Sequence, residues 1–373
     1  MSKLIALLTN NDDDVYCFRK ELIEYFISEG YEFLISCPWG PKFELMQDIP
    51  YIYDNPDIDR RGTNVVADFR LFRHYRKLLK KYRPSILLTY TAKPNVYASM
   101  AAHMLGIPVI NNLTGLGSVA KEKGLKKAII MRLFKMVYRR SDCIMFQNAK
   151  NMQVAIDEGM VKGNYRLIPG SGVNLKRYSL QPYPDGGDGK TGPKVIFNYI
   201  GRVLKDKCVD DYITAARIIR KDYPETEFNI LGFIEPTEAH YEKDLQQLKA
   251  DGVVFYHGSQ KDVRPFLSRA HATIHPSTYG EGMSNVLLES AATGRFIITT
   301  DNPGCQETVI DNKTGFIYPG GNVDALVEAI KRFLALPNDV RKEMGVAGRE
   351  HIKAFSRDKV ISAYKEAIEK LVK

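Results

Sequence analysis

Two glutamates, Glu281 and Glu289, stand on either side of a predicted junction between a loop and a helix. Residues 272–275 before them are typical of a short buried strand, and Ser284 is a suitable N-cap for a helix over residues 285–293. The first backbone N–H groups of such a helix have no partner inside it and favour an anion such as a diphosphate. Because carboxylates accept hydrogen bonds from sugar hydroxyls, two acids around a diphosphate site indicate a nucleotide-sugar.

A second candidate phosphate-binding loop begins at Gly201, where the predicted strand 194–200 ends. Arg202 can place its planar fork across two phosphate oxygens, and Lys207 adds a point charge five positions later. Gly201 allows the backbone to approach a ligand closely. The plainer alternatives are an exposed basic loop here and, for Glu281 and Glu289, a solvated loop acid and a helix-surface acid.

The run from Glu281 to Glu289, E-G-M-S-N-V-L-L-E, with its flanks H-P-S and G-R-F-I-I-T-T, resembles the EX7E signature of glycosyltransferase family 4. The spacing G-R-x4-K that starts at Gly201 resembles the diphosphate clamp of the same family. The resemblance implies catalytic roles for Glu281, Arg202 and Lys207, with Glu281 on the sugar hydroxyls and Glu289 on the ribose. The nucleotide-sugar site implied in this way comprises Gly201, Arg202, Lys207, Gly282, Met283, Ser284, Asn285 and Glu289.

Predicted strands and helices alternate along both halves of the chain, which indicates parallel sheets covered by helices on both faces. We therefore predict an α/β fold, and the resemblance implies the GT-B class, with two Rossmann-like domains that face each other across a cleft. The predicted N-terminal acceptor-binding domain is 1–180, and the Gly- and Pro-rich linker is 181–193. The predicted nucleotide-sugar domain is 194–355, and residues 356–373 form a helix that crosses back to the first domain.

The net charge of +9 is concentrated in the first half of the chain. Residues 1–180 hold 27 Lys and Arg against 17 Asp and Glu, a net charge of +10, whereas residues 181–373 hold 26 against 27, a net charge of −1. A basic half indicates an anionic partner: a membrane surface, a phosphorylated lipid or nucleic acid. Because no nucleic-acid-binding module is visible, we favour lipid phosphate and expect no nucleic acid.

Residues 121–140, which include the predicted helix 125–140, hold eight of these basic residues and one acid. The apolar residues of this helix recur at helical spacing, so its basic face either lies in water or rests on an anionic membrane surface. The five cysteines lack metal-type spacing and favour a reducing compartment. The N-terminal apolar run is too short for a signal peptide, and no apolar run approaches the ~20 residues of a spanning helix.

Loops after the predicted strands of the first half hold candidate acceptor-binding residues. Arg60 and Arg61 suit bidentate phosphate contact, although a solvated basic turn is equally consistent with them. Lys93 precedes Pro94, a suitable first residue of a helix, so its positive charge is expected beside the start of that helix, facing the cleft. We predict a further loop over 111–117, in which backbone approaches the ligand. The candidate acceptor-binding residues are Arg60, Arg61, Lys93, Thr114 and Gly115.

Several features of the first half bear on other possible functions and on the choice of catalytic residues. The loop 9–14 lacks the G-x-G-x-x-G pattern of dinucleotide-binding dehydrogenases. Asp57 and Asp59 form a D-x-D, which manganese-dependent transferases of another fold use, but in a polar loop such acids are far more often solvated, and we expect no metal. Many relatives carry a histidine where this sequence has Thr114, so no histidine is assigned a catalytic role. His103 is interpreted as a packing residue.

The run R-R-G-T-N and the loops at Lys93 and Thr114 resemble enzymes that build capsule or exopolysaccharide repeat units on polyprenyl diphosphate. The resemblance implies a retaining transfer of a hexose or N-acetylhexosamine from a UDP-sugar to a polyprenyl-diphosphate-linked saccharide, in capsule, exopolysaccharide or O-antigen biosynthesis. The nucleotide-sugar is a substrate, so no cofactor is expected. The implied location is cytoplasmic, peripheral to the inner face of the plasma membrane. The alternatives are a GT-B epimerase or phosphorylase and a non-catalytic lipid-surface binding protein.

Overall fold

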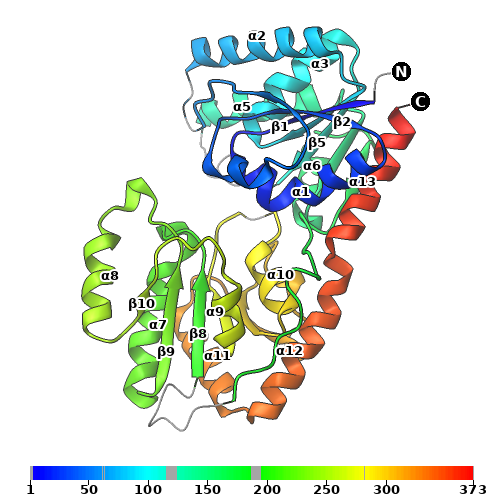
Figure 1. The fold of residues 1–373 in the computed structure, drawn as a ribbon. Coiled ribbons are helices and arrows are strands. Elements are labelled where there is room, and N and C mark those ends of the chain that lie inside the picture. The colour runs from blue at the N-terminus through cyan, green and yellow to red at the C-terminus, as the bar shows by residue number, and fades with distance from the viewer. Residues whose placement is uncertain are drawn as a thin grey trace. The chain divides into compact units, whose positions relative to one another are not determined.

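The chain divides into two compact units, which are described separately (Figure 1). The computed structural model describes residues 3–60, 62, 64–114, 124–185, 195–280 and 282–372.

The first unit is Met1–Gly172 with Arg357–Lys373, and the second is Val173–Ser356. The sequence-based boundary at residue 180 differs from this division. The reason is that Val173 donates its backbone N–H to Phe355 at 2.9 Å, and Tyr178 accepts a hydrogen bond from Arg349 at 2.8 Å. Of the predicted linker, residues 186–193 lie outside the described residues.

The described strands of the first unit form a seven-stranded parallel sheet of order β3-β2-β1-β4-β5-β6-β7. These strands are β1 Leu4–Leu8, β2 Glu32–Ser36, β3 Ile52–Asp54, β4 Ile86–Tyr90, β5 Val109–Leu113, β6 Cys143–Phe146 and β7 Tyr165–Leu167. The helices around it are α1 Asp12–Ser28, α2 Val65–Tyr82, α3 Ser99–Leu105, α5 Gly124–Tyr138, α6 Ala149–Asp157 and α13 Arg357–Leu371. Shorter turns are the 3-10 helix Pro41–Met46 and the π-helix Pro94–Ala98.

Strand β1 shows why the sequence of this sheet is apolar without interruption. Ile5 and Leu7 pack into one core together with residues of α1 and α13, whereas Leu4, Ala6 and Leu8 pack into a second core with α2 and α3. Successive side chains of a strand point to opposite faces, so a strand with helices on both sides buries apolar residues at consecutive positions.

Strand β5 continues through Asn111 and Asn112, where the sequence analysis predicted a loop. That prediction was wrong because both amides are buried and hydrogen-bonded. The Asn111 side chain donates to Thr89 at 2.6 Å and accepts from Ser141 at 2.5 Å. The Asn112 side chain donates to the hydroxyl of Tyr364 at 2.8 Å. Polar residues inside a buried strand are tolerated when each finds a partner.

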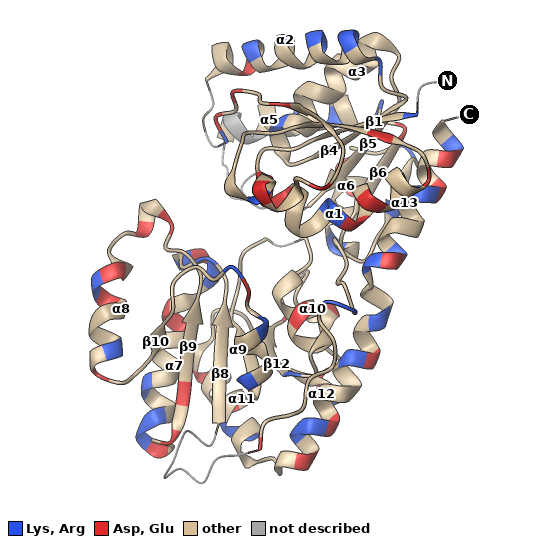
Figure 2. Ribbon diagram, viewed as in Figure 1, with Lys and Arg blue, Asp and Glu red and all other residues tan. Residues whose placement is uncertain are grey.

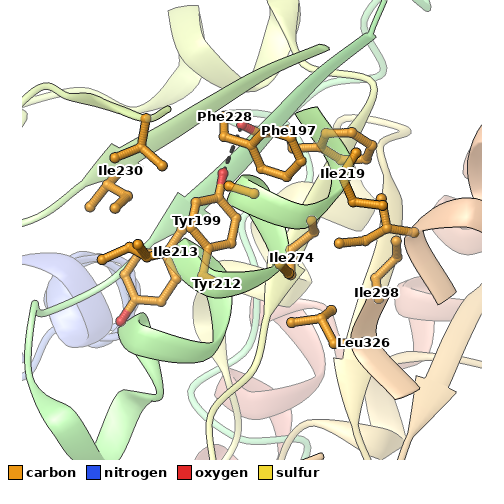
Figure 3. Packing of buried hydrophobic residues seen from close by; sticks show 14 of the residues in the cluster. Phe197, Tyr199, Tyr212, Ile213, Ile219, Phe228, Ile230, Ile274, Ile298 and Leu326 are labelled. Carbon is orange, nitrogen blue, oxygen red and sulfur yellow. Dashed lines mark hydrogen bonds between the residues drawn. The ribbon is translucent and has the colours of Figure 1, made fainter. Parts of the chain in front are cut away.

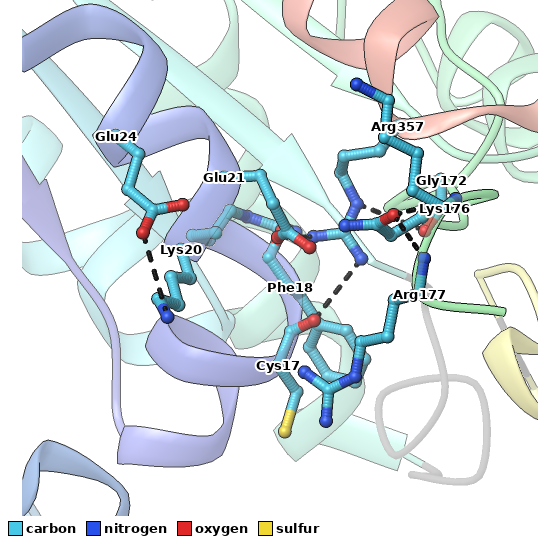
Figure 4. A network of polar contacts seen from close by, with 11 residues as sticks. Cys17, Phe18, Lys20, Glu21, Glu24, Gly172, Lys176, Arg177 and Arg357 are labelled. Carbon is cyan, nitrogen blue, oxygen red and sulfur yellow. Dashed lines mark hydrogen bonds and ion pairs between the residues drawn. The ribbon is translucent and has the colours of Figure 1, made fainter. Parts of the chain in front are cut away.

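Helix α13 belongs to the first unit, and its first residue anchors it there (Figure 4). The guanidinium of Arg357 is buried and makes an ion pair with Glu21 of α1 at 2.9 Å. It also donates to the backbone carbonyls of Cys17 and Gly172, each at 3.2 Å. One side chain thus ties the last helix to α1 and to the end of the N-terminal segment of this unit.

The described strands of the second unit form a six-stranded parallel sheet of order β10-β9-β8-β11-β12-β13. They are β8 Val195–Ile200, β9 Thr226–Leu231, β10 Phe255–Tyr256, β11 Ala272–His275, β12 Phe296–Thr300 and β13 Gly315–Tyr318. The helices are α7 Val209–Asp222, α8 Tyr241–Ala250, α9 Arg264–Arg269, α10 Asn285–Ala292, α11 Val323–Ala335 and α12 Asn338–Ile352. The 3-10 helices are Lys205–Lys207, Pro236–Glu238, Gln306–Thr308 and Lys353–Phe355.

A large aromatic core stabilises this second sheet (Figure 3). Phe197 stacks on Phe228 with ring centroids 4.9 Å apart, and the buried hydroxyl of Tyr212 donates to the carbonyl of Phe197 at 3.1 Å. The loops at the carboxyl ends of these strands therefore project from a rigid base.

Charged residues occur on helices of both units. Lys and Arg recur along α2 (Figure 2). Within the part of the chain that the structure describes, none of the helices combines the length and apolar character needed to cross a membrane.

Candidate functional site

The two loops predicted to bind a diphosphate follow β8 and β11, which are neighbours in the second sheet. The chain order on the two sides of this pair runs in opposite directions, from β8 to β10 on one side and from β11 to β13 on the other. Such a switch point leaves a crevice beyond the carboxyl ends of the strands, and open parallel sheets bind ligands there.

Arg202 and Lys207 both lie over one aromatic ring, that of Tyr279 in the loop after β11. The Arg202 guanidinium lies 5.6 Å and the Lys207 ammonium 5.2 Å from the centre of the Tyr279 ring. Tyr279 itself is fixed because its backbone carbonyl accepts a hydrogen bond from the side chain of Asn302. The structure thus places both basic residues beside the segment that leads into the EX7E run, although they are more than 70 positions away in sequence.

Arg202 is held by a carboxylate that the sequence analysis did not single out. Its guanidinium donates to Glu235 at 2.7 Å, and Glu235 is only 6% exposed. Burial lowers the pKa of Arg202, but hydrogen bonds to Glu235 and Tyr279 outweigh it and raise the pKa. Arg202 therefore stays charged and keeps a fixed orientation. Lys207 is 8% exposed, so its charge also acts in a partly desolvated position.

Helix α10 begins after Ser284, as predicted, but Ser284 does not cap it through its side chain. The Ser284 hydroxyl lies 3.4 Å from the ring nitrogen Nε2 of His275, and its backbone N–H donates to Gly304 at 2.7 Å. Since no acid and no side-chain cap occupies the first turn, the amides at this helix start suit an anion.

Glu307 holds the turn against which Ser284 is placed. Its carboxylate accepts the backbone N–H of Gly304 at 2.7 Å, and Gly304 in turn accepts the N–H of Ser284. Glu307 is therefore a positioning residue for the start of α10.

The predicted nucleotide-sugar residues lie around this helix start. Gly282, Met283 and Ser284 are buried, whereas Asn285 and Glu289 are half-buried on α10. Glu281 lies outside the described residues, so its predicted role stays a prediction.

Neighbouring loops close the edge of this site in the second unit. Gly232 follows β9, and a Cβ there would overlap the carbonyl oxygen of Gly201, so the loops after β8 and β9 approach too closely for a side chain. The loop after β10 joins them, because Gly232 donates its N–H to Gly258 at 2.9 Å. Glycine at position 232 thus permits the close approach of the loops after β8 and β9.

In the first unit, the structure changes the interpretation of Lys93. Its ammonium is ion-paired with Asp68 of α2 at 2.7 Å, and both side chains are largely buried. The positive charge that the sequence predicted at Lys93 is therefore neutralised by Asp68. Arg60 is exposed and Thr114 is half-buried, while Arg61 and Gly115 lie outside the described residues.

Asp59, the second acid of the D-x-D run, has a structural role. It accepts the backbone N–H of Gly62 at 2.8 Å and closes a turn. Among the described residues, no group of three or more His, Cys, Asp and Glu side chains is arranged to hold a metal ion.

The basic helix predicted within residues 121–140 corresponds to α5, which borders a groove of about 980 Å³ in the first unit. The groove is lined by apolar residues such as Met131 and Met160 and by the basic residues Arg132, Lys135 and Arg139. Lys121 and Lys123 lie outside the described residues.

Two family models match most of the chain. The model of glycosyl transferases group 1 matches residues 187–351, and the model of the glycosyl transferase 4-like type matches residues 4–148. The chain belongs to the family 4-like glycosyltransferases. Its two parallel-sheet units also confirm the predicted α/β fold of the GT-B class.

This glycosyltransferase is similar to several bacterial glycosyltransferases. It is 25% identical to the capsular polysaccharide biosynthesis glycosyltransferase CapM of Staphylococcus aureus over 76% of this chain and 78% of that one. It is 23% identical to the N,N'-diacetylbacillosaminyl-diphospho-undecaprenol alpha-1,3-N-acetylgalactosaminyltransferase of Campylobacter jejuni over 88% and 89% of the two chains. Among solved structures, Anabaena Alr3699/HepE in complex with UDP and glucose superposes with a TM-score of 0.80 at 15% sequence identity. The superposition covers 98% of this chain and 99% of that chain.

Proposed function

We propose that this glycosyltransferase moves a hexose or N-acetylhexosamine from a UDP-sugar to a polyprenyl-diphosphate-linked saccharide. The second unit binds the donor, and the first unit binds the acceptor. The observation that carries the donor half is the placement of Arg202 and Lys207 around Tyr279, beside the start of α10. The undecaprenol-linked substrate in the name of the Campylobacter relative supports the acceptor class, and the neighbour that holds UDP supports the nucleotide.

The chemistry of this arrangement suits departure of a nucleoside diphosphate. As the bond from the anomeric carbon to the leaving oxygen breaks, negative charge grows on the diphosphate. Two fixed cations and the amides of a helix start stabilise that charge more than they stabilise the ground state, which lowers the barrier. They supply the electrostatic role that a metal ion fills in other transferases, so the reaction needs no metal.

The remaining roles rest on the resemblance of the EX7E run to family 4. Glu289, on α10, holds the ribose, and Glu281 holds hydroxyls of the donor sugar. We assign no covalent nucleophile, and the transfer proceeds by substitution on the front face, with retention at the anomeric carbon.

We also propose that α5 brings the protein to an anionic membrane surface on the cytoplasmic side. Ile129 and Met136 are exposed apolar residues of this helix, and Arg132 and Lys135 belong to the same segment. Apolar residues enter the headgroup region while each basic residue near the surface contributes about 1 kcal/mol. Vesicle flotation tests this, because Ile129→Asp should weaken binding to anionic vesicles, and neutral vesicles should bind little.

The deciding experiment offers UDP-, GDP- and dTDP-sugars with an undecaprenyl-diphosphate-linked saccharide and identifies products by mass spectrometry and NMR. We expect a lipid-linked saccharide extended by one sugar, with retained anomeric configuration, from a UDP-sugar. Conversion of the nucleotide-sugar without acceptor would indicate an epimerase, and release of a sugar phosphate would indicate a phosphorylase. Calorimetric titration with UDP separates all of these from a lipid-surface binding protein, which would lack a defined nucleotide site.

A further inference from the structure

An exposed aromatic surface lies in the segment that follows β2. Trp39, the only tryptophan of the chain, is 58% exposed. Its ring stacks on the buried ring of Phe43, with centroids 5.3 Å apart and planes 22° apart, and meets the ring of Tyr53 edge-on at 5.4 Å. The indole therefore has an aromatic base on one side and a large apolar surface in contact with solvent.

The segment that carries Trp39 is tied down on both sides. The backbone N–H of Trp39 donates to the side chain of Asn55 at 3.1 Å, and the hydroxyl of Tyr53 donates to the carbonyl of Cys37 at 2.9 Å. Asp12 accepts the N–H of Lys42 at 2.9 Å. These hydrogen bonds fix the backbone on either side of Trp39, so the indole is exposed from a rigid loop.

Gly40, the residue after the tryptophan, lies against the start of α1. A Cβ at Gly40 would overlap the carboxylate of Asp12, which starts α1 after β1. The Trp39 loop is thus packed directly on the loop of the neighbouring strand. Trp39, Asn55 and Asp12 follow β2, β3 and β1, three adjacent parallel strands, and so share the ligand-binding edge of the first sheet.

We propose that Trp39 is the stacking platform for a pyranose ring of the acceptor saccharide, an inference that rests on the proposed function. The C–H face of a pyranose is apolar and packs on an aromatic ring, while its hydroxyls at the rim need polar partners. Asn55 follows β3, and Asp12 and Asp13 lie in the first turn of α1 after β1, so an amide and two carboxylates at the same edge of the sheet supply such partners. A rigid, exposed aromatic residue in a polar rim is the composition of a binding hot spot.

A membrane surface is the other surface that exposed tryptophans contact, and the charges here disfavour it. Asp12, Asp13 and Asp14 lie in the first turn of α1, and Glu44 lies in the turn of Phe43. Lys42 is the basic residue of that same turn. An anionic lipid surface would be repelled by the excess of acids, whereas a neutral sugar ring would not.

Because Trp39 is the sole tryptophan, its fluorescence reports this position alone. The intact protein, without nucleotide, is titrated with methyl glycosides of glucose, galactose, N-acetylglucosamine and N-acetylgalactosamine. We expect a saturable change in tryptophan emission and protection from acrylamide quenching with at least one of them. No saturable change with any glycoside, or a change only with anionic vesicles, would overturn the proposal.

Variants provide the second test, with steady-state transfer to a lipid-linked saccharide as the readout. Trp39→Ala should raise the acceptor KM about tenfold, more than it changes the donor KM, and Trp39→Phe should restore part of the loss. The matched control is Phe69→Ala on α2, because Phe69 is also 58% exposed, and its acceptor KM should stay at the wild-type value. An unchanged acceptor KM in Trp39→Ala contradicts the platform while leaving the transferase activity established. Absence of transfer by the wild type contradicts the proposed function, and the fluorescence titration then decides the platform separately.

Discussion

Arg202 donates a 2.7 Å hydrogen bond to Glu235, a carboxylate that is almost fully buried in the second unit. The pair fixes the guanidinium at the edge of the sheet where Lys207 and Tyr279 also lie. A charge that is already oriented before the ligand binds needs little reorganisation when the leaving group becomes negative.

Removing a charge from the diphosphate loop should reduce turnover strongly. Lys207→Ala should lower kcat by about 100- to 1000-fold, the loss typical of one electrostatic donor in an active site. UDP release from the UDP-sugar is the measurement. The control is Lys205→Ala, because Lys205 is exposed in the same loop and should keep wild-type rates. Full turnover in Lys207→Ala would exclude the proposed role.

The Glu235 carboxylate should matter through Arg202. Glu235→Ala removes the partner of a partly buried guanidinium, so the side chain loses its orientation. We expect Glu235→Ala to raise the donor KM about tenfold. Glu235→Gln keeps a hydrogen-bond acceptor, so its donor KM should rise less. Initial rates at varied UDP-sugar concentration distinguish the two variants. Equal losses in both would show that the negative charge, and not the hydrogen bond, is what matters.

The Gly304 turn should depend on the acceptor oxygen of Glu307. Glu307→Ala leaves the N–H of Gly304 without its partner and loosens the turn that holds Ser284. We expect weaker UDP binding by calorimetry, by several-fold, while Glu307→Gln should retain most of the affinity because its carbonyl oxygen can accept the same bond. Wild-type UDP affinity in Glu307→Ala would contradict this positioning role.

The ion pair of His74 and Asp54 should make the first unit sensitive to pH. The hydrogen bond to Asp54 raises the pKa of His74, and burial raises the pKa of Asp54 less than the hydrogen bonds from His74 and Ser36 lower it. The contribution of His74 is therefore complete below its unfolded pKa of about 6.5 and is lost as the pH rises through its raised folded pKa. The contribution of Asp54 is present above about pH 4 and is lost as the pH falls through its lowered pKa.

Urea unfolding followed by Trp39 fluorescence measures this pH dependence. The free energy of unfolding should decrease from about pH 6.5 upward, and His74→Gln should flatten that decrease. His240→Gln, an exposed histidine of the second unit, is the matched control and should retain the wild-type slope. An identical slope in His74→Gln and wild type would show that this pair does not contribute.

The anchor of α13 should be a major stability determinant of the first unit. Arg357→Ala removes the buried guanidinium that donates to three acceptors, Glu21 and the carbonyls of Cys17 and Gly172. We expect a loss of about 3–5 kcal/mol in the free energy of unfolding, as for one partner of a buried ion pair. Hydrogen exchange should localise the loss to α13 and α1. Lys353→Ala, which removes an exposed surface ion pair, should cost less than about 1 kcal/mol.

Local patterns in the sequence determined the elements and the family. Uninterrupted apolar runs predicted the parallel strands because each strand is covered on both faces, as Leu4 to Leu8 are. The EX7E run and the G-R-x4-K spacing each predicted one half of a diphosphate site, because a helix start and a pair of cations after a strand are each set by residues close in sequence. Even so, β13 and α8 were not predicted.

Tertiary structure alone decided which distant side chains act together. Glu235 and Tyr279 join Arg202 only because β8, β9 and β11 are adjacent in the sheet, and strand order cannot be read from local periodicity. The same holds for Asp68, which neutralises Lys93, and for Thr89 and Tyr364, which allow Asn111 and Asn112 to be buried in a strand. Hydrophobic period and capping act over a few residues, whereas charge pairing and the satisfaction of buried amides depend on partners that only the folded chain brings into contact.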